Sequence, residues 1–257
     1  MEYVIICLVA FAGSGLTLFS GFGLGTLLVP VFGLFFPIEI AISLTAVVHF
    51  LNNLFKLILL GKSADKKTIF RFGIPSVIAA FFGAYTLYFI SDLPYITQYV
   101  LFDKTISILP VKLTIGLLLM LFSLFEIIPR FKNWQVNERY LSIGGFISGY
   151  FGGLSGNQGA LRSAFLIRAQ LSAQSFIATG VVIACLTDIA RLLVYSNTNF
   201  HFINSSNAPL VALATLSAFT GAFLGNKLLK KTTIKTIQSL VAIMLFVFAL
   251  FLVFGII

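Results

Sequence analysis

The sequence predicts an all-α polytopic membrane protein that consists of two inverted-topology repeats. Its apolar composition and the placement of its charges in short connectors support this prediction. Of the 257 residues, 59% are hydrophobic and 10% are charged, whereas soluble domains contain about 25% charged and about 45–50% apolar residues. A water-soluble core of this size cannot bury 29 phenylalanines, so we expect the chain to lie in a lipid bilayer.

Long apolar blocks give about eight helical segments, because a membrane-spanning helix needs roughly 20 apolar residues. In each repeat we expect a broken or re-entrant, glycine-rich helical unit followed by three transmembrane helices. The blocks cover about residues 3–35, 38–60, 69–91, 105–128, 140–168, 172–196, 207–229 and 236–257.

The net charge of +9 comes from basic residues that collect mainly in three connectors. Connectors rich in lysine and arginine lie on the cytoplasmic side of a membrane, so this charge indicates topology, and we expect no nucleic-acid partner. By the same rule the acidic connector 92–103 and the uncharged polar connector 196–207 are external. The basic residues are Lys62, Lys66, Lys67 and Arg71 in the first connector, Arg130, Lys132 and Arg139 in the second, and Lys227, Lys230, Lys231 and Lys235 in the third.

The number of membrane crossings predicts where the helices are broken. Two apolar blocks separate the cytoplasmic 129–139 from the external 196–207, yet a chain that changes sides crosses an odd number of times. Block 140–168, which is long and interrupted by glycines, therefore returns to the side where it entered or divides into two short spans. Block 3–35 is similar and is expected to start and end outside. We thus divide the chain into an N-terminal membrane repeat (1–128), a cytoplasmic connector (129–139) and an inverted C-terminal membrane repeat (140–257).

The two halves also resemble each other in sequence. A constant offset pairs Gly25 with Gly159 and Thr45 with Thr179, and one inserted residue later it pairs Lys56 with Arg191. Further on, AAFFGAYTL (79–87) resembles LSAFTGAFL (216–224). Because these matches occur in the same order in both halves, they favour a duplication.

The first glycine-rich segment runs into Leu-Leu-Val-Pro, as GFGLGTLLVP (21–30). This segment, together with a second glycine-rich block after a basic connector, resembles the TauE/SafE family of bacterial and archaeal membrane permeases over nearly the whole chain. The resemblance implies transport of sulfite, of sulfonates such as sulfoacetate or of related organosulfur anions, and a multi-pass protein in the inner (plasma) membrane of a prokaryote. The second repeat departs from the family pattern, since Asn157 and Gln158 interrupt its glycines and Arg162 precedes the place where a proline is expected.

The glycine clusters predict an anion site near the middle of the membrane. Glycine weakens a helix by about 1 kcal/mol relative to alanine, and the backbone groups that it frees inside a bilayer must face protein or a water-filled cavity. The N–H groups at the start of a half-helix suit an oxyanion. Arg162 either binds this anion or anchors the helix. The glycines elsewhere favour close helix packing; they are Gly13, Gly15, Gly83, Gly116, Gly144 and Gly221. The candidate ligands are Gly23, Gly25, Ser155, Gly156, Asn157, Gln158, Gly159 and Arg162.

The second block of each repeat carries polar residues that are expected to line the rest of the site. Asp188 and Arg191 are three residues apart and can pair on one helix face. They form either a structural ion pair or, together with His49, a site for a coupling proton. The polar residues are Thr45, His49, Asn52, Asn53 and Lys56 in the first repeat and Thr179, Asp188 and Arg191 in the second.

These features predict a secondary transporter of small anions that works by alternating access. The sequence has no nucleotide-binding P-loop, so a gradient must drive transport. The coupling ion can be a proton or sodium. A homodimer is compatible with the sequence. Neither cysteine has metal or redox spacing, and we expect no metal and no cofactor. One alternative is an intramembrane serine hydrolase built on GLSG (153–156), with His201 as the only downstream histidine. Another is a structural membrane subunit that transports nothing.

Overall fold

The computed structural model describes residues 1–20, 23–128, 137–167, 169–197, 203–228 and 234–257. Helices dominate them, and five are long and apolar enough to cross a membrane. The chain is therefore an all-α polytopic membrane protein. The helices are α1 (Glu2–Ser20), α2 (Gly25–Gly33), α3 (Ile38–Leu60), α4 (Lys66–Thr68), α5 (Ile74–Ser91), α6 (Pro110–Ile127), α8 (Leu141–Ser155), α9 (Gly159–Leu166), α10 (Ala173–Ser196), α11 (Ala208–Leu228) and α12 (Ile234–Val253), with short helical turns at Gly61–Ser63, Ile69–Gly73 and Glu138–Tyr140.

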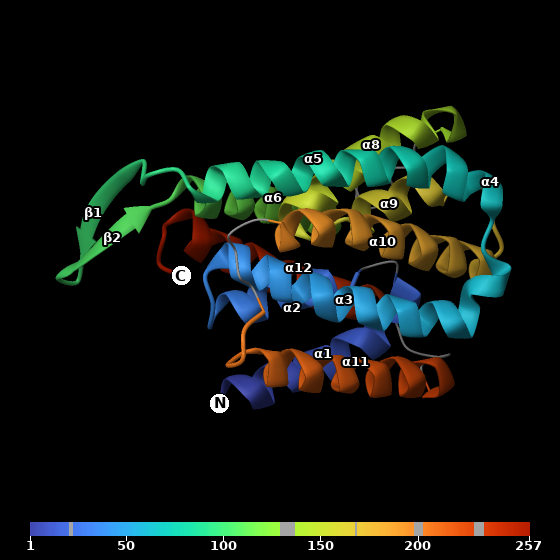
Figure 1. Ribbon diagram of the computed structural model, residues 1–257, viewed down its shortest axis with the longest axis horizontal. Coiled ribbons are helices and arrows are strands. Elements are labelled where there is room, and N and C mark those ends of the chain that lie inside the picture. Colours follow the sequence, from blue (N-terminus) through green and yellow to red (C-terminus); the bar gives the residue numbers. More distant parts are fainter. Residues whose placement is uncertain (21–22, 129–136, 168, 198–202, 229–233) are drawn as a thin grey trace.

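The helices form one elongated bundle with two distinct ends (Figure 1). At one end, which we call the basic end, Arg71 Nη1 lies 3.0 Å from Glu138 Oε1, so the first two basic connectors meet there. Both chain termini and a β-hairpin lie at the opposite, hairpin end (Figure 1). The described connectors are thus distributed between the two ends as the charge pattern predicts. Residues 129–136 of the central connector lie outside the described residues.

Each repeat begins with one long and one short helix. At 1.5 Å per residue, α1 and α2 are about 28 and 14 Å long, and α8 and α9 are about 22 and 12 Å long. Because the hydrocarbon core is about 30 Å thick, α2 and α9 reach only part of the way across it. Each glycine-rich unit is therefore a long helix followed by a half-length helix, and not two full spans.

The packing of the helices has the pattern that a twofold relation between the repeats requires. α1 packs against α11 of the other repeat, and α8 packs against α5 in the corresponding way, while α3 packs against α10 and α6 against α12. α1 starts at the hairpin end (Figure 1), whereas α8 follows Glu138 at the basic end. The two repeats therefore run in opposite directions.

Glycines allow the closest of these contacts. On α8, Gly145, Gly149 and Gly153 face the backbone carbonyls of Phe72, Ser76 and Ala80, so closely that any Cβ there would overlap an oxygen. The six glycines that the sequence assigns to packing also make close contacts, which confirms that prediction: an added Cβ would come within 3.0 Å of a neighbour at Gly13, Gly15, Gly83, Gly116, Gly144 and Gly221.

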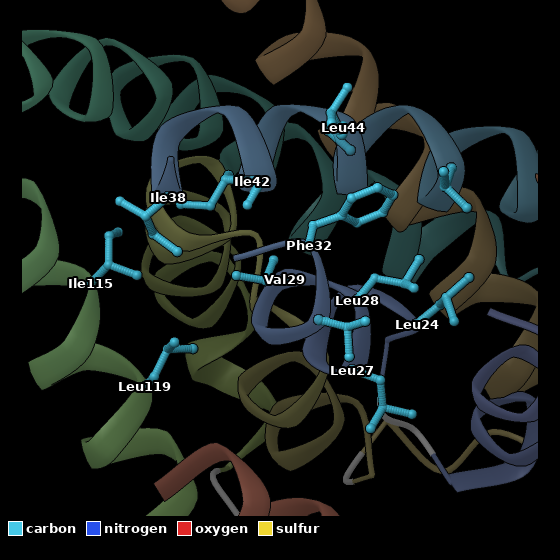
Figure 2. Packing of buried hydrophobic residues seen from close by; sticks show 14 of the residues in the cluster. Leu24, Leu27, Leu28, Val29, Phe32, Ile38, Ile42, Leu44, Ile115 and Leu119 are labelled. Carbon is cyan, nitrogen blue, oxygen red and sulfur yellow. The ribbon is translucent and has the colours of Figure 1, made fainter. Parts of the chain in front are cut away.

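The short helix α2 lies in the centre of the bundle. All nine of its residues are buried, and Figure 2 shows Leu28 and Phe32 of α2 among apolar side chains of α3 and α6. A polar half-helix would leave unsatisfied groups at this depth, which is why the sequence of α2 is almost entirely apolar. The start of α2 is thereby fixed in the interior.

The β-hairpin was not predicted. Its strands β1 (Thr97–Leu101) and β2 (Lys104–Ile108) pair antiparallel, with Thr97 opposite Ile108. The two turn residues Phe102 and Asp103 have positive φ angles of 49° and 60°, as a two-residue turn that matches strand twist requires. The predicted helical block 105–128 is therefore wrong at its start, because residues 105–108 belong to β2 and α6 begins at Pro110.

Candidate functional site

A cavity of about 40 Å³ lies where the two repeats meet. Both broken units reach it, since Gly23 comes from the segment between α1 and α2 and Arg162 comes from α9. α3 and α10 complete the wall, and much of the α10 side is apolar. The polar and glycine residues that matter below are Thr17, Gly23, His49, Asn53, Lys56 and Arg162.

The two helix breaks touch each other directly beside this cavity. A Cβ on Gly25 would lie 2.9 Å from the carbonyl oxygen of Gly156, and the Thr26 hydroxyl donates to Asn157 Oδ1 at 3.0 Å. Gly156 has a φ of +74° and ends α8 in the left-handed conformation, which favours glycine. The wall residues come from the halves of α3 and α10 nearest the basic end, so the cavity lies between this contact and the basic end.

An ion-pair network crosses from one repeat to the other. Arg191 on α10 binds Asp188 Oδ1 through Nε at 2.9 Å and Nη2 at 2.7 Å. The second carboxylate oxygen of Asp188 lies 2.7 Å from His49 Nδ1 on α3. All three side chains are almost completely buried. The expected pairing of Asp188 with Arg191 is confirmed, and His49 is attached to it.

This network determines which nitrogen of His49 carries the proton. An ionised carboxylate only accepts hydrogen bonds, so the short contact with Asp188 assigns the proton to Nδ1. Nε2 then carries the lone pair of the ring. Asn53 Nδ2 lies 3.1 Å from Nδ1 and 3.2 Å from Nε2, and of these two nitrogens only the unprotonated Nε2 can accept its hydrogen. A Cβ on Gly23 would come within 3.1 Å of Nε2, so glycine at this position keeps the nitrogen accessible from the cavity.

Two further cations line the cavity without an acidic partner. Lys56 is 4% exposed and Arg162 is 8% exposed. Among the described residues neither forms an ion pair, whereas Asp188 is already shared by Arg191 and His49. Arg162 Nη1 also has no hydrogen-bond partner in the described part of the chain. A buried charge without a partner costs several kcal/mol, so this arrangement favours an anion in the cavity.

Lys56 and Asn52 connect the cavity to the surrounding helices. The Asn52 side-chain amide is oriented so that both its oxygen and its nitrogen form hydrogen bonds. The oxygen accepts from Lys56 Nζ at 3.2 Å, and the nitrogen donates to the Ala218 carbonyl at 3.3 Å. Ser14 on α1 lies 2.9 Å away. Asn52 therefore joins α3 to α1 and α11 and does not line the cavity.

The remaining predicted ligands lie next to the cavity but not on its wall. Thr45 is buried near Gly25, and its hydroxyl has no partner among the described residues. Gln158 packs against Gly152 with its Oε1 equally unpartnered. Gly159 is buried at the first position of α9.

Thr179 and Ser155 make structural hydrogen bonds instead. The Thr179 hydroxyl accepts from the backbone N–H of Asp65 at 2.8 Å, which ties the first basic connector to α10. In that connector, hydrogen bonds from the side chain and the backbone N–H of Thr68 lower the pKa of Asp65. The Ser155 hydroxyl donates to the Phe151 carbonyl at 2.9 Å and is not directed at a histidine, as a hydrolase would require. His201 lies outside the described residues.

The sequence did not single out Thr17 or the α10 side of the wall. The Thr17 hydroxyl is buried and has no partner among the described residues, while Phe176 and Ile177 form part of the apolar wall. A threonine on an apolar helix is common, and apolar residues on a membrane helix are the rule, so neither position carried a signal. Lys56, by contrast, was visible as the last member of a polar stripe at helical spacing.

A helical bundle with two broken units around a positively charged cavity has the architecture expected of a membrane transporter. Residues 5–252 match the family described as Sulfite exporter TauE/SafE. Because this match covers nearly the whole chain, the protein belongs to the TauE/SafE family of membrane transporters. No curated protein and no solved structure gives a significant match.

Replacing Asn157 by alanine should sharply reduce transport while expression and membrane insertion stay intact. The amide is 4% exposed and joins the two helix breaks through Thr26, so its loss leaves the Thr26 hydroxyl unpaired in the interior, at about 1–3 kcal/mol. Uptake into liposomes would measure the effect. Thr26→Val, which removes the same hydrogen bond from its other end without adding a charge, should lower uptake in the same direction. Unchanged uptake in Asn157→Ala would show that the contact between the breaks does not matter for transport.

Proposed function

We propose that the protein is a secondary transporter of small sulfur oxyanions, with sulfite as the best-fitting substrate, in the inner membrane of a prokaryote. The observation that carries this proposal is the pair of buried cations, Lys56 and Arg162, that face one cavity without an acidic partner among the described residues. Membership of the sulfite exporter family supports the choice of anion.

The charges around the cavity favour an anion over a neutral or cationic solute. With His49 neutral, Lys56, Arg162 and Arg191 contribute three positive charges and Asp188 contributes one negative charge. At an effective dielectric constant of about 20, a unit charge about 4 Å from the anion contributes about 4 kcal/mol of attraction. Two such cations therefore offset a large part of the anion's desolvation.

The size and hydrogen-bonding groups of the cavity favour a small oxyanion. A cavity needs about 10–15 Å³ for each water molecule, so about 40 Å³ corresponds to a few non-hydrogen atoms. Sulfite is of that size, whereas sulfoacetate is larger and needs the cavity to expand. The hydroxyl of Thr17, which has no partner among the described residues, and the amide of Asn53 supply neutral hydrogen bonds beside the two cations.

Alternating access follows from the position of the cavity beside the contact between the two breaks. The contact of Gly25 with Gly156 lies on the hairpin-end side of the cavity, which supports an arrangement that exchanges with the basic end. If the repeats rock against each other, as inverted repeats allow, this contact separates and an equivalent one forms on the other side. The charge rule assigns the basic end to the cytoplasm.

The test uses purified protein in liposomes on a solid-supported membrane. Currents are recorded for sulfite, sulfoacetate, thiosulfate, sulfate and acetate, with and without a pH gradient, and radiolabelled uptake covers electroneutral exchange. We expect a saturable response to sulfur oxyanions, with sulfite stronger than sulfoacetate and acetate inactive. If no sulfur oxyanion gave a current or radiolabelled uptake, the proposed function would be refuted.

A further inference from the structure

His49 lies between the ion pair and the anion cavity. Its Nδ1 is 2.7 Å from Asp188 Oδ2, and its ring lines the same cavity as Lys56 and Arg162. A histidine is the side chain whose charge changes most readily near neutral pH. The mechanism proposed above needs a driving ion but assigns it to no residue.

We propose that His49 Nε2 is the proton-binding site of the transporter and takes up one proton together with each anion. The inference rests on the proposed anion transport and adds the identity of its coupling ion. The proton comes from solution on the side where the anion enters, binds to the lone pair of Nε2, and returns to solution with the anion on the other side. No other bond is made or broken.

The charges around His49 make the two ligands depend on each other. The ionisable groups near it are Asp188, Arg191 and Cys185 on α10, Lys56 on α3 and Arg162 on α9. Arg191 balances the charge of Asp188, so a proton on Nε2 adds a third uncompensated positive charge beside Lys56 and Arg162. Without an anion this addition is repulsive, and with an anion in the cavity it is attractive. Each ligand therefore raises the affinity for the other.

The hydrogen bonds of the ring accommodate both protonation states. Asn53 Nδ2 lies 3.1 Å from Nδ1 and 3.2 Å from Nε2, and in the neutral ring only Nε2 can accept its hydrogen. A protonated Nε2 is itself a donor and cannot keep that bond, so Asn53 has to rotate its amide or withdraw. The new N–H is then available to the anion, because Gly23 has no side chain that covers Nε2. Asp188 holds Nδ1 in both states, so the ring keeps its orientation.

Isothermal titration calorimetry of the purified full-length protein tests the inference by counting protons. Binding is measured in buffers of different ionisation enthalpy, with thiosulfate as a probe that does not titrate near neutral pH and sulfite as the second probe. For the wild type, at a pH where His49 is neutral without the anion, we expect an uptake of up to about one proton per anion, because each ligand raises the affinity for the other. His49→Gln should bind the anion with an uptake near zero, while Ser91→Ala, far from the cavity on α5, should behave like the wild type.

A second measurement keeps the inference testable if His49→Gln binds too weakly for calorimetry. In liposomes, this variant should lose accumulation driven by a pH gradient, while anion exchange between equal pools continues at a reduced rate. Binding by the wild type without proton uptake would overturn the inference and leave anion transport standing. If proton uptake on anion binding were retained in His49→Gln but lost in Lys56→Arg, Lys56 and not His49 would be the proton-binding residue, and the inference would be overturned. Absence of any anion binding by the wild type would instead remove the proposed function, and the inference with it.

Discussion

Replacing Arg162 by glutamine should lower the apparent affinity for the transported anion about 30-fold or more. Arg162 is buried on the cavity wall, and truncating one partner of a buried, hydrogen-bonded charge pair costs about 2–5 kcal/mol. Every 1.4 kcal/mol corresponds to about tenfold in affinity. The concentration dependence of initial uptake in liposomes measures this loss. Arg162→Lys should retain part of the affinity, because lysine keeps the charge but lacks the planar, bidentate donor group.

The same substitution should not destabilise the anion-free protein, and this distinguishes a binding residue from a structural one. Arg162 has no acidic partner among the described residues, so glutamine removes a buried charge whose desolvation is uncompensated. We expect thermal unfolding in detergent at an equal or higher temperature than the wild type. Arg71→Gln is the matched control: its half-buried surface pair with Glu138 is worth about 0–1 kcal/mol, and uptake should stay close to normal. If Arg162→Gln transported normally, the anion site would have to lie elsewhere.

Gly149→Val should give the largest loss of folded protein. A Cβ at Gly149 would overlap the carbonyl oxygen of Ser76 on α5, and backbone atoms cannot rotate away as a side chain can. α5 and α8 would have to separate, which also disrupts the contacts of Gly145 and Gly153 on the same face. Overpacking of an interior costs about 1–3 kcal/mol per site, and we expect Gly149→Ala to fall in that range and Gly149→Val to exceed it.

Yield of monodisperse protein and thermal unfolding in detergent measure this effect. Gly73→Ala is the matched control, because its Cβ would lie 3.5 Å from the nearest atom, Ile183 Cγ1, an ordinary contact. It should unfold close to the wild-type temperature. Equal unfolding temperatures for Gly149→Ala and Gly73→Ala would mean that α5 and α8 are not held as closely as the structure indicates.

Much of the fold follows from features that act locally in the sequence. The apolar blocks had to become helices, because a bilayer offers no partner for exposed backbone groups, and glycine clusters had to interrupt two of them. The hairpin was missed because its strands are short and the apolar end of β2, Ile106 and Ile108, continues into the apolar start of α6. Length alone cannot separate a short apolar strand from the first turn of a helix.

The site was predictable in composition but not in geometry. The sequence identified His49, Asp188 and Arg191 as polar residues at depth, but the contact of His49 with Asp188 depends on how α3 packs against α10. It also treated Lys56 and Arg191 as equivalent. The sequence predicted the pairing of Arg191 with Asp188, but only the structure shows that Lys56, the counterpart of Arg191, faces the cavity. The position of the cavity, on the basic-end side of the contact between the two breaks, is a property of packing, which related sequences in both halves cannot encode locally.

If the protein works by the alternating access proposed above, the pairing of Asp188 with Arg191 would make one of its two end states the preferred resting state. If the repeats exchange roles, Arg191 takes the place of Lys56, but α3 carries no acidic residue after Glu39 that could take the place of Asp188. The two end states are therefore unequal in energy. In one of them Asp188 stays paired with Arg191, and in the other Arg191 has to leave Asp188 to bind the substrate. We therefore expect the anion-free protein to be open mainly to the basic end. In the opposite state, the anion has to compete with the Asp188 carboxylate for Arg191.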